Sequence, residues 1–286
     1  MTDPRLRALY GLKHNPFTPD LPPEALWPAP GVERFALRVE ALVTQGGFAL
    51  LTGDVGLGKS KTLHLLAHRL AKLPDLTLGV MERPQSQLAD FYRELGDIFG
   101  VSLSPLNRFG GFKALRARWK AHCESTRARP VLLVDEAQEV SSACLTELRL
   151  LQSARFDSES LLFTLLAGDA RLPERFRTPD LLPLGSRIRA RLHLEPLTPA
   201  DLEDYLASAL SHAGAPHLMT PELVKTLAAH ALGNLRVLNQ MAAELLAVAA
   251  ERDLPRLDEN LYFDCFSPPT SRPRRPRLTE PATPLP

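Results

Sequence analysis

The feature that most constrains this chain is a glycine-rich loop that separates two apolar segments. Residues 48–72 read FALLTGDVGLGKSKTLHLLAHRLAK, in which an apolar run breaks into glycines and then resumes with helical spacing. The loop at residues 53–60, GDVGLGKS, fits the pattern G-x-x-x-x-G-K-[ST] of the phosphate-binding P-loop. The motif requires a strand before it and a helix after it, and the flanking segments predict both. The sequence therefore predicts a nucleotide-binding loop.

Each residue type in this loop suits a triphosphate. The glycines let the backbone turn its N–H groups toward the phosphates, where side chains would block both the dihedral angles and the close approach. The helix that begins at Lys59 directs the positive end of its dipole at the same anion. Lys59 supplies a cation for the β- and γ-phosphates, and the Ser60 hydroxyl is placed to complete a Mg²⁺ shell. The residues expected to hold ATP are Gly53, Asp54, Val55, Gly56, Leu57, Gly58, Lys59, Ser60 and Lys61.

A second motif lies in the segment PVLLVDEAQEV. Two adjacent acids, Asp135 and Glu136, follow a continuous apolar run at residues 131–134. The run predicts a buried strand, and ligands bind at the carboxyl ends of the strands in open parallel sheets. In a P-loop protein this is the Walker B position. Asp135 is therefore expected to hold Mg²⁺, directly or through water, and Glu136 to orient and polarise the water that attacks the γ-phosphate.

Strand and helix patterns alternate through the first two thirds of the chain. This alternation predicts an α/β fold with a parallel sheet that is buried on both faces. Besides the P-loop strand, strands are expected at 76–81, 131–134, 161–167 and 191–194, and helices at 31–45, 87–99, 112–125 and 142–154. From Thr198 the pattern changes to helices only, at 198–213, 220–231 and 234–251, which predicts a small helical lid.

The sequence accordingly predicts four parts. Residues 1–36 mix prolines with aromatic residues, and we expect an extended lead-in that wraps the nucleotide core. Residues 37–196 are expected to form the P-loop ATPase core, and residues 197–266 the helical lid domain. Residues 267–286 hold seven prolines and are expected to be disordered.

Composition excludes several classes of protein. A net charge of +1 with 23% charged residues gives no global signature of a nucleic-acid coat. Three widely spaced cysteines argue against a disulfide framework and a zinc site, so we expect a reducing cytoplasm. The N-terminus has no apolar signal core, and no run reaches the roughly 18 apolar residues of a membrane span. We therefore expect no contact with a membrane.

Six segments occur in a set order along about residues 8–266. They are YGLKHNPF, GDVGLGKS, LLVDEAQEV, LLAGDARL, LGSRIRARLHLEPLT and GNLRVLNQMAAELL. Together they resemble the AAA+ ATPases, and more narrowly the branch that contains the ExeA-type ATPases and the TnsC, TniB and MuB-like transposition ATPases. The resemblance implies a P-loop AAA+ core followed by a helical lid, with ATP and Mg²⁺ as cofactors and self-assembly of the chain.

The resemblance also gives roles to four residues outside the two motifs. Asp169 stands near the sensor 1 position, which contacts the γ-phosphate or the lytic water; the family more often has Asn or Gln there, and a turn residue is the alternative interpretation. Arg187 looks like the arginine finger that reaches the nucleotide of a neighbouring subunit, with Arg189 as its substitute. Arg236 resembles the sensor 2 arginine of the lid and joins the expected ATP contacts. For the arginines, an ordinary surface side chain is the alternative.

Three functions compete for an ATPase of this branch. The first is a transposition regulator that polymerises on target DNA with ATP, as a ring or a filament, and recruits a transposase. The second is an ExeA-like secretion-type assembly ATPase, and the third is a nucleotide-controlled interaction switch with little turnover. ExeA-type proteins carry a membrane span and a cell-wall-binding region after the ATPase core. This sequence shows neither, so the first function is the favoured hypothesis.

Binding of duplex DNA is expected to be independent of sequence, because the chain has no base-reading motif. A nearly neutral subunit suffices, since weak phosphate contacts repeated around a ring or filament add through avidity. The residues expected to contribute are Arg83, Gln85, Lys113, Arg116, Arg118 and Lys120. Near the C-terminus, Arg272, Arg274, Arg275 and Arg277 are expected to contact either a partner or DNA phosphates.

Overall fold

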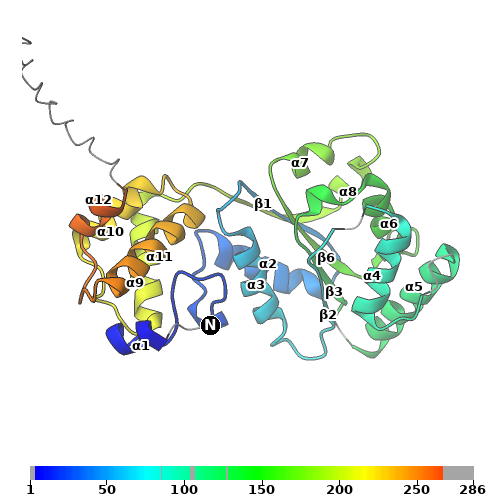
Figure 1. Ribbon diagram of the computed structural model, residues 1–286. Coiled ribbons are helices and arrows are strands. Elements are labelled where there is room, and N and C mark those ends of the chain that lie inside the picture. The colour runs from blue at the N-terminus through cyan, green and yellow to red at the C-terminus, as the bar shows by residue number, and fades with distance from the viewer. Residues whose placement is uncertain (1–3, 85, 104–106, 127, 267–286) are drawn as a thin grey trace, which may run out of the picture.

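The computed structural model describes residues 4–84, 86–103, 107–126 and 128–266. Its strands and their covering helices form one lobe, and the C-terminal helices form a second lobe beside it (Figure 1). The Gln85 side chain and residues 267–286, on which the sequence places possible DNA contacts and a disordered tail, lie outside the described residues. The proposed domain boundary near residue 196 falls in the connection between the two lobes.

A five-stranded parallel sheet forms the centre of the first lobe, in the order β2-β3-β6-β1-β7. Its strands are β1 (Gly47–Gly53), β2 (Leu78–Met81), β3 (Val131–Val134), β6 (Phe163–Gly168) and β7 (Ile188–Leu194). Every residue of β1, β3 and β6 is buried, as their continuous apolar sequences predict. The α/β fold with a buried parallel sheet is therefore confirmed.

Helices cover both faces of this sheet. Phe48 and Leu50 of β1 belong to a core with α4, α5 and α6, whereas Ala49 and Leu51 belong to a core with α2 and α3, because successive side chains of a strand point to opposite faces. The helices are α2 (Val32–Val43), α3 (Lys59–Leu70), α4 (Leu88–Phe99), α5 (Arg108–Ser125) and α6 (Ser142–Gln152), with the short turns η2 (Ala137–Glu139), α7 (Arg171–Arg175) and α8 (Leu182–Gly185).

The second lobe is helical, and its helices begin where the sequence predicts them to begin. The side chains of Thr198, Thr220 and Asn234 cap the first three helices by accepting backbone N–H bonds. A fourth helix was not predicted, because its eight residues give too short a periodic pattern. The helices are α9 (Pro199–Ala213), α10 (Pro221–His230), α11 (Leu235–Glu251) and α12 (Glu259–Phe266).

The lead-in packs mainly on the lid, whereas the sequence predicts that it wraps the nucleotide core. Leu6 of α1 (Pro4–Tyr10), Leu12 and Phe17 belong to the same buried cluster as the lid helices. The physical reason is that the lid helices bury an apolar face that the lead-in completes. The following stretch, around the 3₁₀ turn η1 (Pro23–Ala25), contacts α3 of the first lobe as well.

Three further differences from the predicted elements are local. Helix α5 begins at Arg108, ahead of two glycines, because the Asn107 side chain caps it through the N–H of Gly110. Strand β7 begins at Ile188 rather than at Arg191. A hairpin of two-residue strands, β4 (Ser153–Ala154) and β5 (Glu159–Ser160), has too little sequence pattern to be predicted. In the part of the chain that is described, no helix has the length and apolar character needed to cross a membrane.

The packing of the lead-in makes a prediction about stability. Leu12 is 2% exposed, so Leu12→Ala is expected to lower the free energy of unfolding by about 2–5 kcal/mol through lost burial and a residual cavity. Leu9→Ala is the matched control, because Leu9 of α1 is 40% exposed and its loss should change stability by less than about 0.5 kcal/mol. Urea unfolding of both variants measures the difference. Equal stabilities would show that the lead-in is not part of the lid core.

Candidate nucleotide-binding site

The P-loop connects the end of β1 to the start of α3. Gly56 and Gly58 have φ angles of +87° and +96°, which side chains rarely adopt. A Cβ atom at Gly56 would lie 2.3 Å from the side-chain oxygen of Asn234, so glycine is also required there by a close approach of the lid. The loop thus turns as the sequence predicts, with the lid against it.

Lys59 occupies a position suited to an anion. Its side chain is buried, and Nζ donates hydrogen bonds to the carbonyl oxygens of Gly53, at 2.9 Å, and of Asp54, at 3.1 Å. No carboxylate of the described residues lies within ion-pair distance of Lys59. A buried cation without a charged partner is costly, and a phosphate at the mouth of the loop would compensate the charge. The glycine turn and Lys59 therefore fit a nucleotide phosphate.

The structure brings the two predicted Mg²⁺ ligands together. The Ser60 hydroxyl at the start of α3 donates to Oδ2 of Asp135, at the end of β3, at 2.9 Å. The other carboxylate oxygen, Oδ1, accepts the backbone N–H of Glu136 at 2.9 Å, which fixes the carboxylate orientation. A hydroxyl and a carboxylate are hard oxygen donors of the kind that Mg²⁺ binds beside a phosphate. The residues present therefore fit a magnesium ion.

Glu136 lines a cavity together with Lys59 and Ser60, and Gln138 determines how the Glu136 carboxylate lies. Glu136 has a left-handed backbone, with φ +48°, and its Oε2 accepts a hydrogen bond from the amide of Gln138 at 2.5 Å. The amide oxygen of Gln138 accepts the backbone N–H of Asp169 at 3.2 Å. Gln138 thus ties the end of β3 to the end of β6. Sequence reasoning did not identify Gln138, although it follows the two acids in the DEAQ segment.

The carboxylate of Asp169 is engaged by a neighbour in the chain. Its Oδ2 accepts from Nε of Arg171 at 2.8 Å, and Arg171 also pairs with Glu139 at 2.7 Å. The hydrogen bond from Arg171 is the main cause that holds the pKa of Asp169 below its usual range. Asp169 therefore lies after β6, where the sensor 1 comparison puts it, but with its charge compensated by Arg171. Its role as sensor 1 remains a prediction.

The lid contacts the P-loop directly through the start of α11. The Asn234 amide donates to the carbonyl of Val55 at 2.9 Å, while its oxygen accepts the N–H groups of Arg236 and Val237. The N–H of Arg236 also donates to the carbonyl of Gly56 at 3.1 Å. Arg236 is exposed and lines the cavity, which is a position compatible with the predicted phosphate contact. The sequence predicts Asn234 only as the start of a helix, whereas the structure shows that it also binds the P-loop.

A cavity of about 490 Å³ lies where the lead-in, the P-loop and the lid meet. One end holds the phosphate-binding groups, and the other is apolar and aromatic. At that end the Tyr205 hydroxyl donates to Asn239 at 2.8 Å, and Trp27 packs edge-to-face on Tyr205. The lead-in and lid residues that line it are Phe17, Thr18, Pro19, Leu21, Leu26, Trp27, Tyr205, Leu235, Arg236, Asn239, Gln240 and Ala243. Such an arrangement suits a ligand with a charged and a flat apolar part.

Lys61 ties the lead-in to this site. Its ammonium donates to the carbonyl of Pro19, and burial lowers the pKa of Lys61. The side chain lines the cavity, as expected of an ATP contact, although its hydrogen bond goes to the protein.

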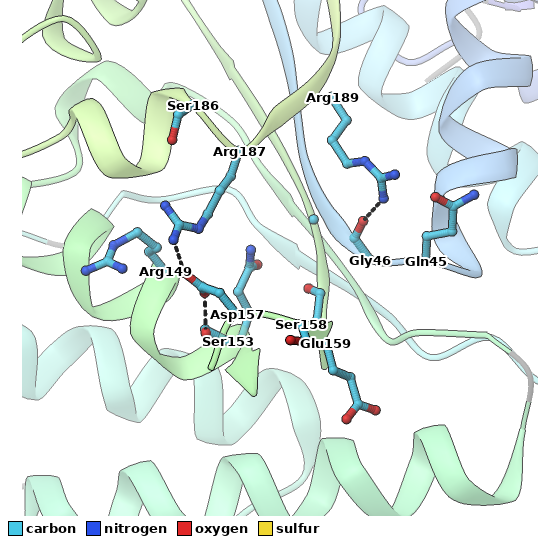
Figure 2. Close-up of a pocket in the computed structure, with 13 residues that line it drawn as sticks. Gln45, Gly46, Arg149, Ser153, Asp157, Ser158, Glu159, Ser186, Arg187 and Arg189 are labelled. Carbon is cyan, nitrogen blue, oxygen red and sulfur yellow. Dashed lines mark hydrogen bonds and ion pairs between the residues drawn. The ribbon is translucent and has the colours of Figure 1, made fainter. Parts of the chain in front are cut away.

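The two candidate finger arginines lie at the opposite edge of the sheet. Arg187 precedes the amino end of β7, and Arg189 is the second residue of that strand (Figure 2). Strand β7 runs parallel to β1, with Ile188 beside Phe48 and Leu194 beside Gly53. The seven residues of β1 span about 20 Å at the strand rise of about 3.3 Å per residue. Neither arginine therefore reaches the P-loop of its own subunit.

The contact between Asn234 and the P-loop leads to a prediction. Asn234→Ala and Thr198→Ala each remove a helix cap and are expected to lower lid stability by about 1 kcal/mol. Only Asn234→Ala also removes the bond to Val55, so only it should weaken ATP binding, by about two- to tenfold. Titration with a fluorescent ATP analogue and thermal unfolding measure the two effects. Equal losses of affinity would assign the effect to lid unfolding instead.

Comparisons with known proteins agree with this arrangement. Residues 43–176 match the family described as AAA domain. The General secretion pathway protein A of Aeromonas hydrophila is 32% identical over 249 residues, which cover 85% of this chain. The chain spans only 44% of the length of that relative.

Solved structures share the fold at low sequence identity. The ORC2 protein of Aeropyrum pernix matches with a TM-score of 0.68 and 18% identity, over 87% of this chain and 70% of that chain. Domain III of the replication initiation protein DnaA of Thermotoga maritima matches with a TM-score of 0.57 and 18% identity, over 88% of this chain and 98% of that chain. Residues 43–176 therefore form an AAA domain, and the chain has the P-loop fold of the AAA+ ATPases.

Proposed function

We propose that this chain binds ATP together with Mg²⁺ and hydrolyses it. The observation that carries the proposal is the 2.9 Å contact between the Ser60 hydroxyl and the Asp135 carboxylate, beside the buried ammonium of Lys59. Segments far apart in the sequence meet here to form a pair of hard oxygen ligands next to a phosphate-binding turn. This is the combination that phosphoryl transfer from a nucleoside triphosphate requires.

The residues of this chain divide the work. When bound, Mg²⁺–ATP supplies the transferable phosphoryl group and the metal charge. Lys59 and the P-loop N–H groups hold the phosphates, and Ser60 and Asp135 would hold the metal. Glu136 orients a water for in-line attack and accepts its proton, while the Gln138 amide keeps the Glu136 carboxylate in place. Arg236, from the lid, adds positive charge to the same cavity.

Hydrolysis is proposed to need a second subunit. Arg187 lies about 20 Å from its own P-loop, so its charge stabilises the transition state only at the nucleotide of a neighbour. Arg189, on the same edge, is the substitute for this role. Each subunit then completes the site of the next, in a ring or in a filament.

For the cellular role, we propose a secretion-type assembly ATPase. The General secretion pathway protein A of Aeromonas hydrophila supports this role, because its similarity extends over 85% of the chain, which is more than the AAA domain at residues 43–176. In this role, ATP hydrolysis would drive the assembly of a larger complex. The sequence alone favours a transposition regulator, and no comparison supports a transposase as partner.

A DNA-organised polymer remains the second candidate function, and helix α5 is the observation that bears on it. Lys113 and Arg118 are exposed there, as DNA contacts would be. Arg116, however, donates to the carbonyls of Leu150 and Leu151 at the end of α6, and Lys120 pairs with Glu124 at 3.7 Å. The basic face is therefore smaller than the sequence predicts. A basic face of this size would bind DNA only weakly in one subunit, so binding would depend on repetition of the face in a polymer.

Two substitutions separate binding from hydrolysis. Lys59→Ala is expected to weaken ATP binding severely, because it removes the cation of the phosphate site. Glu136→Gln is expected to bind ATP normally and to lower turnover by about 100-fold or more, since the amide cannot accept the proton of the water. ATP affinity and steady-state hydrolysis measure both effects. Full turnover in the Glu136 variant would remove Glu136 from catalysis, whereas little turnover in the unsubstituted chain would favour a nucleotide-controlled switch.

Hydrolysis across subunits makes a second prediction. Activity per subunit should rise with protein concentration, and Arg187→Ala should abolish the rise while ATP affinity stays nearly unchanged. Mixing Arg187→Ala with Lys59→Ala should restore partial activity, because one variant supplies an intact P-loop and the other an intact finger. Activity that is independent of concentration and shows no complementation would contradict hydrolysis in trans.

Duplex DNA in the same assay distinguishes the two candidate roles. A DNA-organised polymer predicts stimulation at low salt that disappears as salt screens the phosphate contacts. A secretion-type assembly ATPase predicts the same activity with and without DNA.

A further inference from the structure

The hairpin of β4 and β5 has a strained and exposed tip. Arg155, Phe156 and Asp157 have left-handed φ angles of +46°, +55° and +67°, which are unfavourable for each of these side chains. The Phe156 ring is fully exposed, so no apolar packing inside the subunit stabilises this conformation. The side-chain contacts that accompany the strained backbone are polar: Arg155 pairs with Glu159 at 3.2 Å, and Asp157 binds two neighbours.

Asp157 holds the candidate finger inside its own subunit. Its carboxylate accepts hydrogen bonds from the Ser153 hydroxyl and from Nη2 of Arg187, which are the main causes that lower the pKa of Asp157 (Figure 2). The carboxylate is therefore charged at neutral pH. The other terminal nitrogen of Arg187, Nη1, donates to the carbonyl of Pro183. In this conformation, the charge of Arg187 and both of its terminal nitrogens are engaged within its own subunit.

A second guanidinium lies beside the pair. Arg149 of α6 lines a second cavity, of about 340 Å³, together with Asp157 and Arg187, and the charge of Arg149 also lowers the pKa of Asp157. Within the described ranges, Arg149 makes no ion pair with a carboxylate. Asp157 thus binds Arg187 and lies near Arg149, with which it could form a second ion pair.

We propose that this hairpin is a docking surface for a second copy of the chain. On docking, the Asp157 carboxylate exchanges its ion pair with Arg187 for one with Arg149, and this exchange frees the Arg187 finger. The inference rests on the hydrolysis in trans proposed above. The identity of the docking partner follows from the position of Arg187. Only a second copy of the chain brings an ATP phosphate to Arg187, and that copy must cover the surface around this side chain. Exposed apolar side chains flank the finger there: Phe156 at the tip and Leu182 at the start of α8, 55% exposed.

Docking and release are coupled through the tip. Phe156 precedes Asp157 directly, so burial of its ring against a second copy displaces the Asp157 carboxylate. Arg149 then keeps that carboxylate paired, which avoids a buried charge without a partner. An isolated subunit would keep its finger folded back, and assembly would release it.

Two variants at the tip test the proposal in opposite directions. Asp157→Asn removes the charge that holds Arg187, and Phe156→Asn removes the ring that docks. Asparagine tolerates left-handed backbone better than other side chains, so neither variant adds strain. The matched controls are Glu159→Gln, which changes a hairpin carboxylate that pairs with Arg155, and Phe109→Asn, which removes a ring that is 68% exposed on α5.

Hydrolysis is measured over a range of protein concentrations, and self-association by sedimentation velocity with a non-hydrolysable ATP analogue. Asp157→Asn is expected to reach half-maximal activity at a protein concentration at least about threefold lower than the unsubstituted chain, because the finger no longer has to be released. Phe156→Asn should need a concentration about tenfold higher and sediment as a smaller species, since it loses a buried ring. Arg149→Gln should also raise the concentration needed. The two controls should match the unsubstituted chain.

Other outcomes overturn the proposal. Activity of Asp157→Asn below that of the unsubstituted chain, at every concentration, would show that Asp157 supports the finger rather than restrains it. Unchanged sedimentation of Phe156→Asn would remove the docking surface. If Arg187→Ala is inactive while Asp157→Asn has the same activity as the unsubstituted chain, hydrolysis in trans is retained and only the restraint of Arg187 by the hairpin is refuted. If Arg187→Ala is fully active, both proposals fail.

Discussion

The parallel pairing of β1, β3 and β6 is the constraint on which the candidate site depends. Because the three strands run in the same direction and in register, their carboxyl ends lie at one edge of the sheet. The P-loop, the two acids after β3 and Asp169 after β6 therefore converge, although they come from distant parts of the sequence. The hydroxyl of Ser60 then meets the carboxylate of Asp135 without any long or flexible connection. A buried parallel sheet thus gives a rigid base to groups that must hold a metal and phosphates.

The lid makes this edge into a cavity. Asn234 uses its side chain both to begin α11 and to bind the carbonyl of Val55, so the same residue fixes the lid helix and places it on the P-loop. Gly56 is the counterpart of this contact, because any side chain there would collide with Asn234. The lead-in packs on the lid core and supplies part of the apolar wall. A change in lid position would therefore alter the phosphate end and the apolar end of the cavity together.

The two edges of the sheet hold different halves of the proposed chemistry. The phosphate-binding groups lie at the carboxyl edge, and Arg187 lies at the amino edge beside the β4–β5 hairpin. The length of β1 separates them within one subunit, so in the proposed mechanism they would meet only between subunits. Assembly would then be a condition for hydrolysis. The ion pair between Arg187 and Asp157 adds a cost to finger release that a neighbouring subunit would offset.

The sequence by itself determined the elements whose signals are local. The glycines of the P-loop, the apolar run before Asp135 and the helix starts at Thr198 and Asn234 follow from backbone sterics, side-chain periodicity and capping, which neighbouring residues alone specify. Only the tertiary structure decided the contacts between segments that carry no shared pattern. The bridge by Gln138, the packing of the lead-in on the lid and the pairing of Arg187 with Asp157 each depend on the paths of separate loops through space. Hydrogen-bonding groups of this kind occur throughout the sequence, and their partners are set by the packed core that brings them together.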